Sequence, residues 1–313
     1  MIVALAGGVG GAKLARGLAQ LEADRLTVIV NTGDDFDHLG LRICPDLDTV
    51  TYTLCGMANP LTGWGVNNET WNFMNQTKLL GGQDWFMLGD RDLALHVLRT
   101  EWLNQGRTLT EVTVHVAKRM GVRAAILPMS DSPVRTRVQT NEGWLDFQDY
   151  FVRRRCDIPI TGLRFDGAES ARPTQAVVSA LDAATAFIIC PSNPYVSIDP
   201  ILSVAGMRRR LELARAPRVA VSPIIGRKAV KGPAAKMMAE LGHSPSSLTV
   251  ARKYSGLIDG LMIDRADTEE ASQIEAMGIA VEILNTLMLT PDDSVAVSEA
   301  AIAFAKKLSS RQD

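Results

Sequence analysis

Short apolar runs alternate with stretches of helical periodicity along most of the chain. Residues 1–6 are apolar and end at a glycine, which predicts a short buried strand, and residues 12–21 carry apolar side chains at helical spacing. The same order returns later, with predicted helices at 173–184 and 199–215 and predicted strands at 186–190 and 218–222. This alternation is typical of a doubly wound, mostly parallel, Rossmann-like α/β sheet.

A polar segment rich in tryptophan interrupts the alternation. Residues 60–85 hold three of the five tryptophans among Gly, Asn and Thr, and a helix capped by Thr108 or Thr110 is predicted further on. We therefore predict a single α/β domain over residues 1–313, with a mainly helical subdomain inserted at about 56–123. Residues 134–147 alternate about an Asn-Glu-Gly turn and predict a β-hairpin.

Composition excludes several classes of protein. The net charge of −2 gives no reason to expect nucleic acid or an acidic membrane as a partner. The four cysteines are scattered without a Cys-x-x-Cys pair, which is typical of reduced thiols in the cytoplasm. The apolar start lacks a basic segment and breaks at a glycine, so no signal peptide is predicted, and no apolar run is long enough to span a membrane.

Four glycines, Gly7, Gly8, Gly10 and Gly11, separate the first predicted strand from the first predicted helix. Glycine lets bare backbone approach a ligand, and the helix start offers free N–H groups and a positive dipole end. Lys13 adds a charge that is unfavourable for a first helical turn unless an anion lies nearby. We predict phosphate binding here, although a tight turn alone would explain one or two of the glycines.

This glycine segment fits neither of two familiar phosphate motifs. A Walker loop has Gly before its lysine and Ser or Thr after it, but Ala12 and Leu14 stand there. A dinucleotide fingerprint has a third glycine where Lys13 stands, and its second strand is followed by an acid, whereas the strand here is followed by Asn31.

Further polar residues follow other predicted strands: Asn31, Asp34, Asp35, Ser192 and Asn193. Ligands of open α/β sheets bind at this carboxyl edge, and carboxylates beside phosphates suit Mg²⁺. A solvated acidic turn is the alternative for the three acids of this loop, Asp34, Asp35 and Asp37. The four histidines show no zinc spacing, and no nucleophile–base arrangement can be argued from spacing.

Two more groups of charged residues stand at predicted helix starts. Asp46 and Asp48 lie two residues apart, so one is expected to cap the helix and the other is free for function. Asp90, Arg91 and Asp92 open a later helix, where the acids stabilise the dipole and Arg91 is the unexpected residue. The tryptophans either pack within the insertion or stack on a ligand.

The chain resembles the 2-phospho-L-lactate transferase family, in its bacterial branch, through motifs that occur in the same order over nearly its whole length. They are Gly-Gly-Val-Gly-Gly-Ala-Lys (7–13), Asn-Thr-Gly-Asp-Asp (31–35), Pro-Asp-Leu-Asp-Thr (45–49), Leu-Gly-Asp-Arg-Asp (88–92), Leu-Pro-Met-Ser-Asp (127–131), Pro-Ser-Asn-Pro (191–194) and Ser-Pro-Ile-Ile-Gly (222–226).

The resemblance implies a step in the biosynthesis of the deazaflavin coenzyme factor 420. The acceptor would be 7,8-didemethyl-8-hydroxy-5-deazariboflavin, whose ribityl hydroxyl attacks the distal phosphorus of a guanosine diphosphate ester of lactate, enolpyruvate or glycerate, releasing GMP. Magnesium is the expected cofactor and a homodimer the expected assembly.

By motif match, the resemblance places Asp48, Arg91 and Trp71 at the deazaflavin. Its phosphate side comprises Gly8, Gly10, Gly11, Lys13, Asn31, Ser192 and Asn193. Phosphoryl transfer depends on positioning and charge neutralisation, which fits the lack of a covalent nucleophile. We expect Asp48 and an acid of the 34–35 pair, taken as Asp35, to hold magnesium, Asp48 to act as base, ligand or both, and Lys13 to offset developing charge.

Two alternatives remain. The related gluconeogenesis-linked cell-shape regulators share the glycine segment and the Asn-Thr-x-Asp-Asp turn but bind a nucleotide-sugar without this transfer. The Gly-Asp-Arg-Asp motif at 89–92 and the tryptophan-rich insertion favour the transferase. A non-enzymatic nucleotide sensor is the other alternative, which turnover of a guanylyl donor would exclude.

Overall fold

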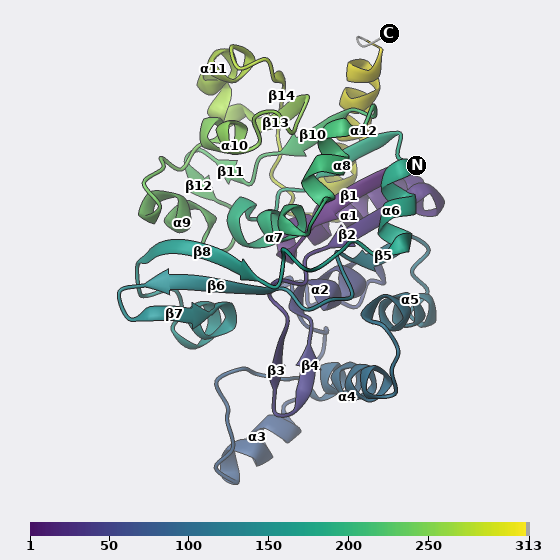
Figure 1. Ribbon diagram of the computed structural model, residues 1–313, viewed down its shortest axis with the longest axis vertical. Coiled ribbons are helices and arrows are strands. Elements are labelled where there is room, and N and C mark those ends of the chain that lie inside the picture. Colours follow the sequence, from purple (N-terminus) through teal and green to yellow (C-terminus); the bar gives the residue numbers. More distant parts are fainter. Residues whose placement is uncertain (311–313) are drawn as a thin grey trace.

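A seven-stranded parallel sheet forms the centre of the molecule in the computed structural model, which describes residues 1–310 (Figure 1). Its strand order is β14-β13-β10-β9-β1-β2-β5. The strands are β1 (Ile2–Ala6), β2 (Leu26–Val30), β5 (Ala125–Pro128), β9 (Ala186–Ile189), β10 (Arg218–Val221), β13 (Gly260–Asp264) and β14 (Ala280–Leu284). The prediction of a doubly wound, Rossmann-like α/β sheet is confirmed.

Helices cover both faces of the sheet, because the central strands are apolar on both sides. In β1, Val3 and Leu5 belong to one hydrophobic cluster, and Ile2, Ala4 and Ala6 belong to the other. The second cluster lies under α1 (Gly8–Glu22), α2 (Pro45–Leu54), α5 (Leu109–Arg119) and α12 (Pro291–Ser309). The first lies under α6 (Gln175–Asp182), α7 (Asp199–Ser203), α8 (Met207–Leu213), α9 (Ala234–Glu240), α10 (Ser247–Lys253) and α11 (Ala271–Glu275).

The single helix predicted at 199–215 is wrong in one respect: the structure divides it into α7 and α8. Gly206 adopts a φ of +84° directly before Met207. A left-handed residue cannot continue a right-handed helix, so the chain turns at this glycine.

The segment between β2 and β5 holds the hairpin β3 (Phe36–His38) and β4 (Leu41–Ile43), followed by α2, α3 (Asn72–Leu79), α4 (Asp90–Asn104) and α5. In Figure 1 the hairpin, α3 and α4 extend below the central sheet. The predicted capping box of α5 is present, since Thr108 accepts from Glu111 N–H and Glu111 from Thr108 N–H. The division into one domain with an insertion at 56–123 stays a prediction.

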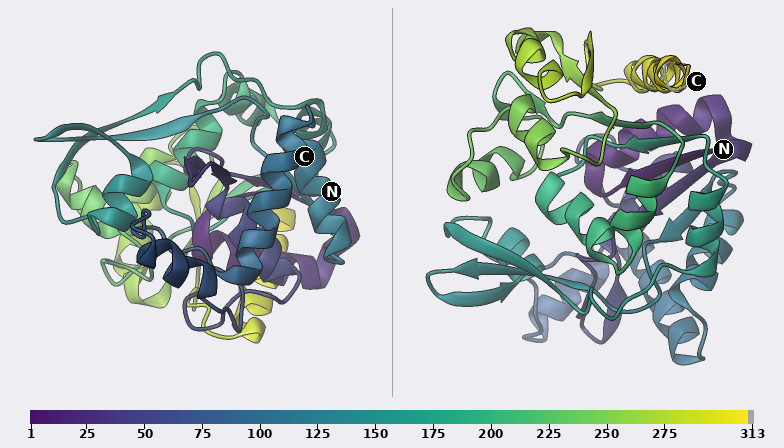
Figure 2. Two further views of the ribbon diagram at one scale, coloured as in Figure 1. Left: turned by 90° about the horizontal axis from the view of Figure 1, so that it is seen from below. Right: turned by 45° about the horizontal axis from the view of Figure 1, so that its top comes forward.

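A second, antiparallel sheet extends to one side of the body, as Figure 2 shows. It contains β7 (Gly143–Asp146), β6 (Arg135–Thr140) and β8 (Ile160–Asp166) in that order. The hairpin predicted at 134–147 is confirmed as β6 and β7. A two-stranded ribbon, β11 (Ile224–Ile225) and β12 (Lys228–Ala229), follows β10.

Within residues 1–310, the structure has no helix that is both long enough and apolar enough to span a membrane.

Candidate functional site

The glycine segment lies at the carboxyl edge of the sheet, mostly inside α1 rather than in a loop before it. Gly7 is extended, Gly8 has a φ of +62°, and the helix begins at Gly8, four residues earlier than the periodicity predicts. A Cβ on Gly10 would lie 2.3 Å from the backbone oxygen of Pro191, and one on Gly11 would lie 2.4 Å from Ser192 Oγ. These glycines therefore let α1 pack closely on the segment after β9.

Ser192 and Asn193 lie beside this helix start. The buried Ser192 hydroxyl accepts a hydrogen bond from the Gly7 N–H at 3.1 Å. Asn193 Oδ1 accepts from the Tyr195 N–H at 3.0 Å, so this side chain caps the next turn of chain. The structure thus brings together two segments that are predicted to bind phosphate, the glycine segment and residues 192–193.

A carboxylate of the protein, Asp46, meets the start of α1. Its Oδ1 accepts from the Gly8 N–H at 2.8 Å and its Oδ2 from Asn31 Nδ2 at 2.9 Å. Asn31 Oδ1 in turn accepts from the Gly33 N–H at 2.8 Å. The prediction that one of these acids caps α2 is wrong, since Cys44 is the N-cap residue and makes no side-chain capping bond; Asp46 instead stabilises the positive end of α1.

Asp34 lies in the same buried cluster. Burial raises the pKa of the Asp34 carboxyl well above its usual range, and the neighbouring Asp46 charge raises it further. Burial also raises the pKa of Asp46 to about 6, against the hydrogen bonds from Asn31 and Gly8. Two carboxyls in one buried site disfavour double ionisation, so this cluster holds a proton readily.

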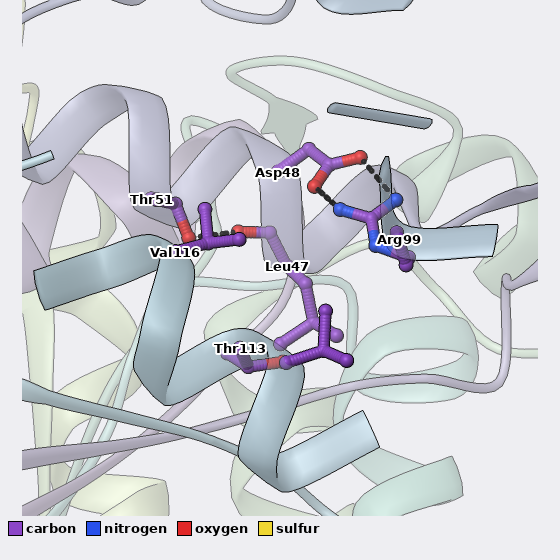
Figure 3. Close-up of a pocket in the computed structure, with 7 residues that line it drawn as sticks. Leu47, Asp48, Thr51, Arg99, Thr113 and Val116 are labelled. Atoms are coloured by element: carbon purple, nitrogen blue, oxygen red, sulfur yellow. Dashed lines mark hydrogen bonds and ion pairs between the residues drawn. The ribbon is translucent and has the colours of Figure 1, made fainter. Parts of the chain in front are cut away.

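Asp48, the other acid of α2, faces a guanidinium instead. Arg99 of α4 directs Nη1 to Asp48 Oδ2 at 3.1 Å and Nη2 to Asp48 Oδ1, and Figure 3 shows this paired contact. The Arg99 and Asp48 residues are 4% and 6% exposed, so the pair is buried. Burial raises the pKa of Asp48, and the Arg99 charge opposes that rise.

Two further residues of α4 and one of α2 complete this second cluster. His96 Nδ1 lies 3.7 Å from Asp48 Oδ2, and His96 Nε2 lies 3.4 Å from Asp92 Oδ1. Tyr52 donates its hydroxyl to Asp92 Oδ1 at 2.6 Å. Asp48, Asp92 and His96 each offer one possible ligand atom within 4.8 Å of the others, which is close enough for a metal ion.

Asp35 is buried near the same guanidinium. Burial raises the pKa of Asp35 to about 7, while a hydrogen bond with Cys44 and the charges of Arg135 and Arg99 oppose the rise. Its Oδ1 has no hydrogen-bond partner among the residues that the structure describes. An unpartnered buried carboxylate oxygen is a ready ligand for a cation.

Lys13 lies close to other cations. Its Nζ donates to the backbone oxygen of Met288 at 2.6 Å, and burial together with Lys231 and Arg16 lowers its pKa. Asp293 opposes this lowering. Several cations close together next to the start of α1 favour an anion there.

Arg91 and Trp71 lie at the corner between α3 and α4. Arg91 Nη1 donates to the backbone oxygen of Asn67 at 2.7 Å, and its N–H donates to Glu69 Oε1 at 2.6 Å. Trp71 precedes the first residue of α3 and is 38% exposed. In the described part of the chain, no hydrogen bond or ion pair joins either residue to Asp48.

Sequence reasoning missed Arg99, His96 and Tyr52 as members of the Asp48 cluster. A signal exists for two of them: Asp92, His96 and Arg99 follow one another at spacings of four and three residues. Such residues share one face of a helix, so a titratable stripe is visible along α4.

Comparison with known proteins identifies the family. A family model described as 2-phospho-L-lactate transferase CofD matches residues 2–300. A phosphoenolpyruvate transferase from Streptomyces griseus is 40% identical over 314 residues, with 98% of this chain and 99% of the relative covered. A 2-phospho-L-lactate transferase from Methanosarcina mazei is 37% identical over 302 residues, with 96% and 99% covered.

A crystal structure of a UPF0052 family member from Bacillus halodurans shares the fold. Its TM-score is 0.62 at 16% identity, and the match covers 96% of this chain and 98% of that chain. The family resemblance seen in the ordered motifs is thus confirmed, and relatives from bacteria and from Methanosarcina both carry transferase names. The chain therefore belongs to the 2-phospho-L-lactate transferase family.

Proposed function

We propose that this transferase moves a phospholactyl-type group from a guanosine diphosphate ester to the ribityl hydroxyl of 7,8-didemethyl-8-hydroxy-5-deazariboflavin in factor 420 biosynthesis. The transferred group is phospholactate, phosphoenolpyruvate or phosphoglycerate. The hydroxyl oxygen bonds to the distal phosphorus, the bond from that phosphorus to the bridging oxygen breaks, and GMP leaves with this oxygen. Relatives named for phospholactate and for phosphoenolpyruvate support this range of donors.

One observation carries the proposal: the start of α1 and the acids of α2 meet at one edge of the sheet. The Gly8 N–H reaches Asp46, and Asp48 lies two residues further along α2. A site for a charged diphosphate thus adjoins a site of carboxylates, while no covalent nucleophile is required. Positioning and charge neutralisation are sufficient for such a transfer.

We assign the donor phosphates to the start of α1 and the segments beside it: Gly8, Gly10, Gly11, Lys13, Asn31, Ser192 and Asn193. Gly8, Gly10 and Lys13 are half-buried, so this end of the helix stays accessible. Lys13 offsets the charge that develops on the phosphoryl oxygens. The contact between Ser192 and Gly7 supports a shared phosphate site, because it joins the two segments.

We assign magnesium to Asp35 and Asp48, because carboxylate oxygens suit this ion. Asp35 has a buried Oδ1 that no described residue contacts by hydrogen bond, and each Asp48 oxygen retains a lone pair beside its bond to Arg99. Oxygen ligands are those that Mg²⁺ prefers, and the bound ion would neutralise phosphate charge. Asp48 in addition accepts the hydrogen bond, and then the proton, of the ribityl hydroxyl.

The deazaflavin is assigned to Asp48, Arg91 and Trp71. The contact with Asn67 uses Nη1 of Arg91 and leaves Nε and Nη2 for a ligand, and the exposed Trp71 ring offers an aromatic face to a flat ligand. We further propose a cytoplasmic homodimer without nucleic acid or membrane as partner.

Mass spectrometry tests the reaction. The purified protein is incubated with Mg²⁺, the deazaflavin and one of the three guanosine diphosphate esters in separate reactions, with EDTA as a matched control. We expect the acceptor mass to increase with release of GMP for one donor, and no product with EDTA. Lack of product with every donor, together with a co-purifying nucleotide-sugar, would contradict the proposal and favour the regulator.

A further inference from the structure

Arg99 makes more polar contacts around Asp48 than charge neutralisation needs. Besides the paired contact, Nη1 donates to the backbone oxygen of Arg42 at 3.3 Å and lies 3.4 Å from His96 Nδ1. The guanidinium therefore joins α4 to α2 and to the residue that follows Leu41 in β4. The contacts with Asp48, Arg42 and His96 fix the orientation of the guanidinium.

Apolar side chains form one part of the surroundings of this pair. Leu47, Val112 and Val116 line the small cavity beside Asp48 and Arg99, together with Thr51 and Thr113 (Figure 3). A buried ion pair in such a place contributes little more stability than apolar side chains of similar volume. Stability alone thus gives no reason for an arginine here.

A paired guanidinium–carboxylate contact does supply orientation. Two parallel hydrogen bonds fix the plane of the carboxylate, which a single ammonium cannot do. Beside the guanidinium, His96 Nδ1 lies near the same Asp48 Oδ2, and Asp92, which accepts from the Tyr52 hydroxyl, lies at His96 Nε2. Asp48 therefore contacts the Arg99 guanidinium and the His96 ring, which both belong to α4.

We propose that Arg99 is a positioning residue that fixes the Asp48 carboxylate for transfer, with His96 as the second contact. The inference rests on the proposed function of Asp48 and adds a residue that the family motifs did not include. Arg99 acts through Asp48 and does not touch the substrate. Its loss leaves a rotating, unpaired carboxylate, so turnover falls much more than substrate binding.

Kinetics of Arg99→Gln and Arg99→Lys test this role. We expect kcat per folded molecule to fall about 100-fold for Arg99→Gln, since a small misplacement of a reacting group has this effect. We expect Arg99→Lys to recover only about a tenth of wild-type kcat, because it restores the charge but not the fork. The KM of the donor and the fluorescence-measured Kd of the deazaflavin should stay within about 3-fold.

Arg218→Gln is the matched control. Arg218, the first residue of β10, pairs with Asp259 through Nε at 2.9 Å and Nη2 at 2.7 Å, at the opposite edge of the sheet. Its removal also breaks a paired contact, so urea unfolding should show a comparable loss of stability while kcat stays within about 2-fold of wild type.

Wild-type kcat in folded Arg99→Gln would overturn the inference, and full recovery in Arg99→Lys would overturn the orienting role. Either result would leave the proposed function intact. If the wild-type protein formed no product from any donor, the proposed function itself would fall, and the inference with it.

Discussion

Two sets of acids at one edge of the sheet have nearly the same sequence pattern and opposite surroundings. Each combines one acid of the loop after β2 with one acid of the first turn of α2. Asp34 and Asp46 meet an amide, a backbone N–H and each other. Asp35 and Asp48 instead lie in the field of the Arg99 guanidinium.

The difference shows that the partner, rather than the acid, determines what each set can do. In the first set, neutral donors satisfy Asp46 and connect α2 to α1, which is a structural role. In the second set, the Arg99 charge opposes the rise that burial causes in the pKa of Asp48, while one oxygen of Asp35 has no partner within residues 1–310. The second set is therefore the one suited to a metal ion and a reacting hydroxyl.

The largest effect on stability is expected from Asp48→Ala. This change leaves the buried Arg99 guanidinium without its counter-charge, which costs about 3–5 kcal/mol. Urea unfolding followed by circular dichroism measures the loss. A loss below about 1 kcal/mol would show that the pair is solvated, and the contrast between the two sets would weaken.

Asp46→Ala should lower the stability less, by about 1–3 kcal/mol. It leaves the Gly8 N–H and the Asn31 amide without their acceptor, but it leaves no buried cation without a counter-charge. The same unfolding experiment, run beside Asp48→Ala, gives the difference directly. An Asp46→Ala loss larger than that of Asp48→Ala would reverse the assignment of structural and functional acids.

The stability of the metal-free protein should also depend on pH through Asp35. Its folded pKa of about 7 lies above the value of about 3.9 for an unfolded Asp, so the folded state binds more protons between these values. Asp35 should therefore contribute a fall of about 2–3 kcal/mol in stability as pH rises from 4 to 7. Asp35→Asn should remove this contribution and leave the part that other buried carboxyls such as Asp46 cause. Equal slopes for wild type and variant in urea titrations would contradict the buried state of Asp35.

The smallest effect is expected from Asp37→Ala. Asp37 pairs with Arg42 Nε at 2.7 Å, but its side chain is 64% exposed. Solvent screening limits such a pair to about 0–1 kcal/mol. Thermal unfolding should show almost no shift in Tm. A loss of stability comparable to that of Asp48→Ala would mean that burial does not determine how much each acid contributes to stability.

The sheet could be predicted from sequence, because its strands are short apolar runs between helical stretches. The strand order could not, since β9 joins β1 from a distant part of the chain. The start of α1 at Gly8 could not be predicted either, because four clustered glycines predict a loop, yet Gly10 and Gly11 serve close packing on Pro191 and Ser192.

The candidate site could likewise be predicted only in part from the sequence. Asp35 and Asp48 follow from local motifs, because their positions relative to strand and helix ends are visible in the sequence. Arg99 lies fifty-one residues beyond Asp48, and only the packing of α4 on α2 brings the two together. Sequence also could not tell which α2 acid caps a helix, since Asp46 caps α1, a helix that precedes it in the chain.

The most direct test compares Asp48→Asn with Asp46→Asn in the transfer reaction, with kcat taken per folded molecule. The isosteric change removes the charge of one acid at a time. We expect Asp48→Asn to lower kcat at least about 100-fold with little change in the deazaflavin Kd, and Asp46→Asn to stay within about 10-fold of wild type. An unchanged kcat in Asp48→Asn would contradict the account.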